Sequence, residues 1–294
     1  MMVGLSGSGK STVASNYEQS GYKVVASDDI RTEVLGNRQD TDHNDIVFRI
    51  AHNRIRDYIL AGYNVVFDAT NITMKNRRCA LKAIADIPNV HKKCIITAQT
   101  IDHCLKKNRD REYPVPDEVI MRQAMRFQVP FLEEGFDEIE LSRVNNDNTP
   151  LNVISDLFVK YDLPHDNPHH KQGVGSHCWD TMYYILDKKG GSVLVGAALA
   201  HDYGKYFTKK LDEDNVAHFK GHENIGAYKL LSREYSIPVA YSPTNLLDMI
   251  FYVNYHMLPY TWKTPKAREK WHKIFGNEKY NNLMLLHKAD MHSK

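Results

Sequence analysis

The chain has 294 residues, 42% of them hydrophobic and 25% charged, which is typical of a globular protein with about 150 residues in each of two domains. A formal net charge of +2 is too small to indicate nucleic-acid binding by itself. No apolar run approaches the about 18 residues of a membrane span, and the start of the sequence lacks a signal-peptide pattern. The four cysteines form no CxxC pair, which fits a reducing compartment. We therefore expect a cytoplasmic protein with no membrane partner.

The first half of the sequence predicts an α/β domain. Four apolar stretches rich in β-branched residues are predicted as strands: residues 22–27, 63–70, 92–100 and 136–144. Residues 45–63, between the first two strands, have the apolar spacing of a helix, and Gly62 is suited to its end. The predicted apolar face is formed by Ile46, Val47, Ile50, Ala51, Ile55, Tyr58 and Ile59. This alternation predicts a parallel sheet with helices on both faces.

The second half predicts a different fold class. The turn-rich residues 143–152 separate it from the first half, and we place the domain boundary at residue 148. Helical patterns follow in five stretches: residues 176–189, 192–205, 222–235, 243–257 and 281–290. The sequence therefore predicts an α/β domain over residues 1–148 and an all-α domain over residues 149–294.

The two halves also differ in their polar residues. Residues 1–150 contain 12 of the 14 arginines, whereas the remaining residues contain 11 of the 15 histidines. Arginine suits bidentate binding of phosphates, and histidine is the commonest metal ligand. A difference in average composition between two domains would explain this distribution equally well, so motifs are needed to assign a function to it.

Residues 4–11, GLSGSGKS, match the phosphate-binding pattern GxxxxGK[ST]. In such a loop the backbone N–H groups surround a phosphate, Lys10 reaches the β- and γ-phosphates, and the Ser11 hydroxyl ligates Mg²⁺. A short strand before the loop and a helix after it supply the required context. The residues predicted to bind ATP, or another nucleoside triphosphate, with Mg²⁺ are Gly7, Ser8, Gly9, Lys10, Ser11 and Thr12.

Polar residues at the ends of the next strands suggest a binding site for the molecule that accepts the phosphate, because ligands bind there in open α/β sheets. We call this the acceptor site. Asp28 could take a proton from an attacking hydroxyl and Arg31 could hold an anionic group, although Asp28 or Asp29 could instead cap a helix. Asp68 and Asn71 follow the next strand. Charge runs downstream could neutralise a γ-phosphate or form a solvated face; their arginines are Arg77, Arg78, Arg109, Arg111, Arg122 and Arg126.

Over residues 1–145 these motifs, GLSGSGKST, SDDIR, FDATN…NRR and KKNRDREYPVP, resemble the polynucleotide 5'-kinases of phage and bacterial nucleic-acid repair. The resemblance implies that Asp28 is the general base and that Arg31 contacts the acceptor's phosphate. It implies that Asp68 orients this site and that Arg111, with Arg109, binds the ATP phosphates from a lid. We also expect Asn71 and Arg77 to contact the substrate.

A second set of polar residues lies in the helical half. His201 and Asp202 are adjacent at the end of an apolar run. Histidines and a further aspartate recur at other predicted helices or helix ends: His177, His222, His256 and Asp290. Any one such histidine is more often a core residue than a ligand. As a set, imidazole and carboxylate without thiolate suit Mn²⁺, Fe, Ni²⁺, Co²⁺ or Mg²⁺.

The order H…HD…H…H…D over residues 165–294 resembles the HD-superfamily metal-dependent phosphohydrolases. The resemblance implies one metal held by His177, His201, Asp202 and Asp290. It allows a second at His222 and His256, with Asp202 bridging the two. Lys205 could contact a phosphate oxygen, or could equally be a surface lysine.

These resemblances lead to a hypothesis of an enzyme with two activities on nucleic-acid ends. The kinase would phosphorylate a 5'-OH end of RNA or DNA, with RNA favoured, and the HD domain would remove a 2',3'-cyclic or 3'-terminal phosphate, so that a separate ligase could join the ends. A small-metabolite or nucleoside kinase fused to a nucleotidase or phosphodiesterase is the alternative enzyme. A third alternative makes one half a non-catalytic nucleotide or metal sensor.

Overall fold

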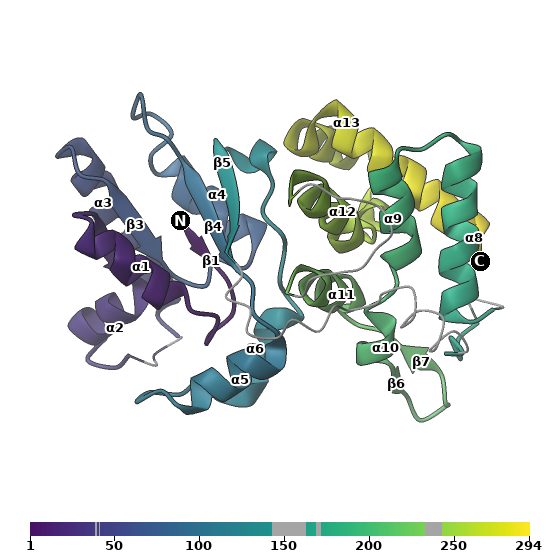
Figure 1. Cartoon of the computed structure of the whole chain (residues 1–294), viewed down its shortest axis with the longest axis horizontal. Coiled ribbons are helices and arrows are strands. Elements are labelled where there is room, and N and C mark those ends of the chain that lie inside the picture. The colour runs from purple at the N-terminus through teal and green to yellow at the C-terminus, as the bar shows by residue number, and fades with distance from the viewer. Residues whose placement is uncertain (39, 41, 143–162, 169–171, 233–242) are drawn as a thin grey trace. The chain divides into compact units, whose positions relative to one another are not determined.

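The computed structural model describes the chain except residues 39, 41, 143–162, 169–171 and 233–242 (Figure 1). The chain divides into two compact units, the first formed by residues 1–123 and 134–144 and the second by residues 124–133 and 145–294. The predicted boundary at residue 148 lies outside the described residues and stays a prediction. Among the described helices, none combines the length and the apolar character needed to cross a bilayer.

The first unit contains the predicted parallel sheet. Its strands are β1 (Met2–Val3), β2 (Lys23–Ala26), β3 (Val65–Asp68), β4 (Lys93–Thr97) and β5 (Glu138–Ser142). β1 pairs with β4 and β4 with β5, while β2 pairs with β3, all in parallel. The Gly4 N–H donates to Thr70 O and Asn71 Nδ2 donates to Met2 O, which connects β1 to the chain that follows β3. All four strands predicted from the sequence are confirmed.

Helices cover this sheet (Figure 1). Along residues 1–142 they are α1 (Lys10–Gln19), α2 (Ser27–Leu35), α3 (Asn44–Leu60), α4 (Met74–Lys82), α5 (Ile101–Arg109), α6 (Asp117–Ala124) and the short 3-10 helix η1 (Leu132–Glu134). The predicted face of α3 is buried at Val47, Ala51 and Ile55, which pack in one cluster with Val25 and Phe67 of the strands. Gly62 lies one residue beyond the C-cap of α3 with φ 85°.

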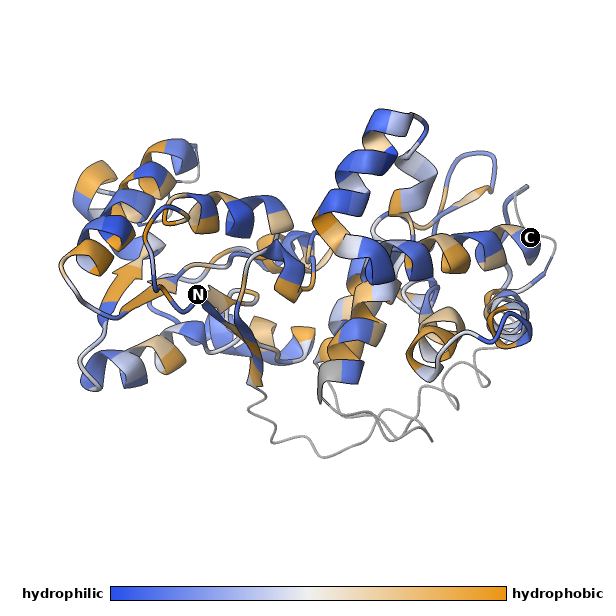
Figure 2. Cartoon of the chain, turned by 90° about the horizontal axis from the view of Figure 1, so that it is seen from above, coloured by the Kyte–Doolittle hydropathy of each residue, from blue (hydrophilic) through white to orange (hydrophobic). Residues whose placement is uncertain are grey.

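The second unit is largely helical, as predicted, but it also contains a small hairpin. Its helices are α8 (Val174–Asp187), α9 (Ser192–Ala200), α10 (Lys205–Thr208), α11 (His222–Leu231), α12 (Pro243–Tyr255), the 3-10 helix η2 (Leu258–Thr261) and α13 (Pro265–His292). β6 (Lys210–Leu211) and β7 (Ala217–His218) pair antiparallel, so the prediction of an all-α domain is wrong at this point. α13 is kinked at Gly276, where φ is 72°. Helices of both units combine hydrophobic and hydrophilic residues (Figure 2).

Residues 124–133, which we call the inserted segment, belong to the second unit although both flanking stretches belong to the first. Phe127, Val129 and Phe131 are at most 3% exposed. The side chain of Asn254 on α12 accepts from the Val129 N–H at 2.6 Å and donates to Phe127 O at 3.1 Å. Tyr255 OH donates to Val129 O at 3.2 Å. The inserted segment is therefore part of the core of the helical unit.

Replacing Phe131 with alanine is expected to destabilise the helical unit by about 3–5 kcal/mol, because a buried Phe→Ala change loses apolar contact and leaves a cavity. The Phe131 ring packs edge-on against Phe251 and Phe275, with centroids 5.1 and 5.4 Å away. All three tryptophans of the chain lie within residues 145–294. Tryptophan fluorescence during urea unfolding therefore reports on this unit.

The matched control is Leu132→Ala, because this neighbouring side chain is 48% exposed. We expect a change below about 1 kcal/mol for the control. Equal urea midpoints for the Phe131 variant and its control would show that the inserted segment does not stabilise the helical unit.

Candidate functional site

The phosphate cradle is the loop between β1 and α1. Gly7 has φ 80°, and a Cβ there would overlap with the carbonyl oxygen of Cys104. Gly9 has φ 91° and is the N-cap of α1, so glycine supplies the left-handed backbone at both positions. The Ser8 hydroxyl lies 2.7 Å from the Thr97 hydroxyl at the end of β4. The loop therefore wraps around the start of α1, where backbone N–H groups and the helix dipole favour an anion.

Lys10 crosses the cradle instead of pointing to solvent. It is 8% exposed, and its Nζ donates to Leu5 O at 2.7 Å. Burial lowers the pKa of Lys10, and the negative charge of Asp68 opposes that shift. The charges of Arg111 and Asp28 also act on this ammonium group. Thus the P-loop lysine, two predicted acceptor carboxylates and the predicted lid arginine share one electrostatic environment.

Asp28, the predicted carboxylate of the acceptor site, is held by arginines. Arg31 Nη1 donates to Asp28 Oδ1 at 2.7 Å, and Arg31 Nη2 donates to Asn44 Oδ1 at 2.7 Å. Arg111 Nη2 lies 3.8 Å from Asp28 Oδ2. Because α2 begins at Ser27, Asp28 and Asp29 lie in its first turn and neither is the helix cap considered above. The Asp28 side chain is 39% exposed and can be reached by an acceptor.

Three residues predicted near the acceptor or the ATP phosphates have other partners. Arg77 is fully buried and donates from Nε and Nη2 to both carboxylate oxygens of Glu134, at 2.8 and 2.5 Å. We therefore assign Arg77 a structural role. Asn71 is also fully buried and bonds the backbone of β1. Arg109 is exposed and pairs with Asp117.

Gln123 contacts the phosphate cradle, although its place in the sequence did not predict this. Gln123, at the end of α6, accepts from the Ser6 N–H at 2.8 Å and donates to the Ser6 hydroxyl at 3.0 Å. Its position in an arginine-rich stretch gave no signal, because the contact joins residues 117 positions apart. Gln123 ties α6 to the phosphate-binding loop.

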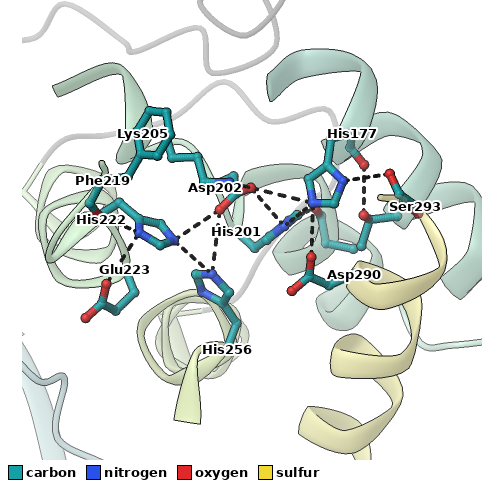
Figure 3. A network of polar contacts seen from close by, with 12 residues as sticks. His177, His201, Asp202, Lys205, Phe219, His222, Glu223, His256, Asp290 and Ser293 are labelled. Carbon is teal, nitrogen blue, oxygen red and sulfur yellow. Dashed lines mark hydrogen bonds and ion pairs between the residues drawn. The ribbon is translucent and has the colours of Figure 1, made fainter. Parts of the chain in front are cut away.

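In the helical unit the predicted polar residues gather around Asp202, which lies between two groups of side chains (Figure 3). Asp202 Oδ2 is 3.6 Å from His177 Nε2 and 3.4 Å from His201 Nε2. Asp202 Oδ1 is 3.1 Å from His222 Nε2 and 3.7 Å from His256 Nε2. The ligand atoms of each group lie within 4.8 Å of one another. One carboxylate thus contacts a different pair of imidazoles with each oxygen.

Asp290 completes the first group. Its Oδ1 lies 3.1 Å from His177 Nε2, and its Oδ2 accepts from Tyr260 OH at 2.6 Å. The hydrogen bond from Tyr260 to Oδ2 leaves Oδ1 of Asp290 directed to the imidazole of His177. Tyr260, which the sequence did not single out, therefore fixes the orientation of Asp290.

All four imidazoles turn Nε2 inward because Nδ1 is engaged by the backbone. His201, His222 and His256 donate from Nδ1 to carbonyl oxygens three residues earlier, at 2.7, 2.9 and 2.7 Å. His177 donates from Nδ1 to Ser293 O at 3.0 Å. A carbonyl only accepts, so these contacts place a proton on Nδ1 and leave the Nε2 lone pair inward. Such outer contacts are typical of imidazoles that bind metals.

The inward atoms have the chemistry of a cation site. His177 and His201 bring their Nε2 atoms within 3.2 Å, and His222 and His256 do the same. Two inward lone pairs at this distance repel, and either a shared proton or a cation between them relieves the repulsion. Burial lowers the pKa of His201, which favours the neutral imidazole. Burial also acts to lower the pKa of His256, but the hydrogen bond and charge of Asp202 outweigh it and raise that pKa. The residues present therefore fit one divalent ion in each group, with nitrogen and carboxylate donors.

Lys205 lies beside Asp202, held by a histidine that the sequence did not single out. Lys205 Nζ is 2.6 Å from Asp202 Oδ2 and 3.0 Å from His165 Nε2. Burial, and then the charge of Lys205, lower the pKa of His165 to about 4, so its imidazole accepts from the ammonium group at neutral pH. Lys205 is 6% exposed, which excludes the surface-lysine alternative.

Gly204 allows the turn after Asp202 to pack against α11. A Cβ at Gly204 would overlap with the carbonyl oxygen of His222 and lie 2.8 Å from Gly226 N. We expect Gly204→Ala to destabilise the helical unit by about 1–3 kcal/mol. Because the turn would move away from α11, we also expect weaker Mn²⁺ binding, measured by isothermal titration calorimetry. Gly191→Ala is the control, since a Cβ there meets no atom within 4 Å. Unchanged stability and Mn²⁺ affinity would contradict this account of the turn.

The parallel sheet and the cradle define a P-loop domain of the kinase-like class. The family model described as an AAA domain matches residues 1–130, which contain the cradle and the acceptor residues. A domain of this kind implies a nucleotide with Mg²⁺. Curated proteins yield no match to the chain.

Proposed function

We propose that the chain repairs broken nucleic-acid ends, phosphorylating a 5'-OH end in the first unit and removing a 2',3'-cyclic or 3'-terminal phosphate in the second. The observation that carries the pairing is Asp202, whose two oxygens contact separate pairs of inward-facing imidazoles. Phosphoryl transfer from ATP relies on a P-loop, Mg²⁺ and positively charged side chains, and the first unit supplies the P-loop and these side chains. The arrangement around Asp202 suits a divalent-metal phosphohydrolase, so the chain would contain a second active site.

In the proposed kinase reaction the chain positions the reactants and stabilises charge. Asp28 accepts the proton of the attacking 5'-hydroxyl, and Arg31 fixes this carboxylate while remaining near the acceptor's own phosphate. Lys10 and Arg111 provide positive charge at the β- and γ-phosphates. The Ser11 hydroxyl at the start of α1 would hold Mg²⁺, which would supply further positive charge for the transfer. The 5'-oxygen bonds to the γ-phosphorus as the bond to the β-phosphate oxygen breaks, leaving ADP.

In the proposed hydrolase reaction the residues of the helical unit bind the divalent ions and orient the phosphate of the substrate. His177, His201, Asp202 and Asp290 would hold one divalent ion, and His222 and His256 would hold a second with Asp202. Bound ions would supply Lewis-acid activation for attack of water on a phosphoester. Lys205 carries a positive charge 2.6 Å from Asp202, where it can contact a phosphate oxygen of the substrate. His165 keeps that ammonium group in place.

Both ends produced by RNA cleavage would be substrates of one chain. A break that leaves a 5'-OH and a 2',3'-cyclic phosphate needs a phosphoryl transfer on one side and a hydrolysis on the other. A separate ligase could then join the ends. This requirement supports RNA as the favoured substrate.

The proposal is tested by incubating the full chain with a short RNA that has a 5'-OH end and a 2',3'-cyclic phosphate. With ATP, Mg²⁺ and Mn²⁺ we expect both end modifications, resolved by electrophoresis and mass spectrometry. Nucleosides and nucleoside 2',3'-cyclic phosphates are assayed in parallel. Phosphorylation of nucleosides without any labelling of RNA or DNA would replace this proposal with a metabolite kinase. Metal binding without hydrolysis would make the helical unit a sensor.

A further inference from the structure

An exposed basic face lies at the start of α13 and just before it. Lys263, Lys266, Lys270 and Lys273 are all exposed, and the last three recur at helical spacings of four and three residues. They therefore project from the same side of the helix. Between residues 263 and 273 the sequence has five basic residues and a single acidic one. We call these four lysines the basic face.

The lysines of the basic face are not held in ion pairs among the described residues, and Glu269 is the one acid between them. Other lysines of the same unit do take part in ion pairs. Lys279, further along α13, is 2.9 Å from Glu133 and 3.2 Å from Asp248. Lys209 is 2.6 Å from Asp166. The basic face is therefore a local excess of positive charge in a chain whose formal net charge is only +2.

An aromatic ring lies beside the basic face. Trp271 is partly exposed, and Lys270 Nζ is 5.3 Å from its ring centroid. Because consecutive residues of a helix project about 100° apart, the ring lies at the edge of the face, next to Lys270. The ring is fixed from the inside: it stacks on Phe275 at 5.2 Å and on the buried Trp262 at 6.1 Å. A fixed aromatic side chain next to lysines is a combination that binds single-stranded nucleic acid, because bases stack on the ring while lysines contact phosphates.

The basic face is connected to the metal-site residues by short stretches of chain. Lys263 follows His256 by seven residues, which limits their separation to about 24 Å even in a fully extended chain. Tyr260, between them, donates to Asp290. Along α13, Lys273 precedes Asp290 by 17 residues, so the rise of about 26 Å in a straight helix is an upper limit, because α13 is kinked at Gly276. These distances suit a strand of a few nucleotides with its 3' end at Asp202.

We propose that the basic face binds the phosphate backbone of a single-stranded RNA whose 3' end is processed at the Asp202 site, with Trp271 as a stacking surface. This inference rests on the proposed hydrolase function and adds a binding site for the polymer. A mononucleotide has no further phosphates of a chain for the lysines to contact, so the face would favour RNA ends over free nucleotides. The gain comes from charge and is therefore sensitive to salt.

The test compares the full chain with the variant Lys266→Gln, Lys270→Gln, Lys273→Gln. The matched control is Lys188→Gln, Lys189→Gln, Lys210→Gln, which removes the same charge from exposed positions of the helical unit. Binding of a fluorescent 12-nucleotide RNA is followed by anisotropy between 50 and 200 mM NaCl. Hydrolysis is measured with Mn²⁺ on the 12-nucleotide RNA 2',3'-cyclic phosphate and on a mononucleoside 2',3'-cyclic phosphate.

We expect the slope of log affinity against log salt to become about two smaller for the face variant, since each lost phosphate contact contributes about 0.7 in a single strand. The ratio of the RNA KM to the mononucleotide KM should rise about tenfold at 50 mM NaCl. Face and control variants that agree in both measurements would overturn the inference. A wild-type chain that hydrolyses neither substrate would refute the proposed function, while the binding slopes would still decide on the face.

Discussion

Replacing Asp202 with asparagine is expected to abolish divalent-metal binding by the helical unit. Asparagine keeps the shape but loses the charge that faces all four imidazoles. Removing outer contacts of a metal ligand already costs 10–100-fold in affinity, so losing a shared ligand should cost at least about 100-fold. The readouts are Mn²⁺ content after dialysis and the rise in melting temperature with Mn²⁺. Hydrolysis should be lost as well, whereas kinase activity should remain.

The variant also leaves the buried ammonium of Lys205 without its carboxylate partner, which is itself destabilising. A double variant, Asp202→Asn with Lys205→Met, removes both charges and separates loss of metal from loss of fold. Asp187→Asn is the control, because that carboxylate is exposed at the end of α8 and pairs only with the adjacent Lys188 among the described residues. Undiminished Mn²⁺ binding by a folded Asp202 variant would refute the metal site.

Asp28→Asn is expected to slow phosphorylation of a 5'-OH RNA by about 100- to 10,000-fold, the usual contribution of a general base. Asparagine can still contact Arg31, but it cannot accept the proton of the attacking hydroxyl. ATP affinity should change less than about threefold, because Lys10 and the backbone of the cradle are unaltered. Single-turnover kinetics measure the chemical step, and fluorescent-nucleotide titration measures binding.

The neighbouring Asp29 provides the matched control. Its side chain is 70% exposed and lies 3.2 Å from Arg38 Nη1. Asp29→Asn makes the same chemical change one residue away and should leave the rate within about twofold. A normal rate for Asp28→Asn would show that Asp28 is not the general base. Equal losses of rate in both variants would show that the negative charge of the first turn of α2, and not one carboxylate, is needed.

The helices and strands could be predicted because the spacing of apolar residues within each one is a local feature of the sequence. The buried positions Val47, Ala51 and Ile55 repeat at helical spacing, and the strands are short apolar runs, so each element is specified within a few residues of sequence. The cradle is equally local, because its glycines, Lys10 and Ser11 are consecutive. These features require no knowledge of distant contacts.

The candidate metal site could be predicted only as a set of residue types in chain order. Their roles as ligands stay predictions, but the structure adds contacts that no local pattern contains. Tyr260 and Asp290 are 30 residues apart, and His165 and Lys205 are 40 apart. Arg77 shows the opposite case: an arginine in a basic stretch looked available, yet its partner Glu134 is 57 residues away in sequence.

The inserted segment was missed although a signal was present. Phe127, Val129 and Phe131 alternate with polar or small residues, as expected for an extended stretch with one buried side. Because they directly follow the arginine-rich stretch, sequence reasoning assigned them to the first domain. Which core receives such a stretch depends on residues such as Asn254 and Tyr255, more than 120 positions later.

The inserted segment has a consequence for the synthesis of the chain. Phe131 is translated 144 residues before Phe275, one of the rings that buries it. At about 5–20 residues per second, its apolar side chains wait about 7–30 s on the ribosome before their core exists. During that time the first unit has all its strands up to Ser142 but carries an exposed Phe-x-Val-x-Phe stretch. The nascent chain therefore exposes three apolar side chains, Phe127, Val129 and Phe131, that the finished protein buries.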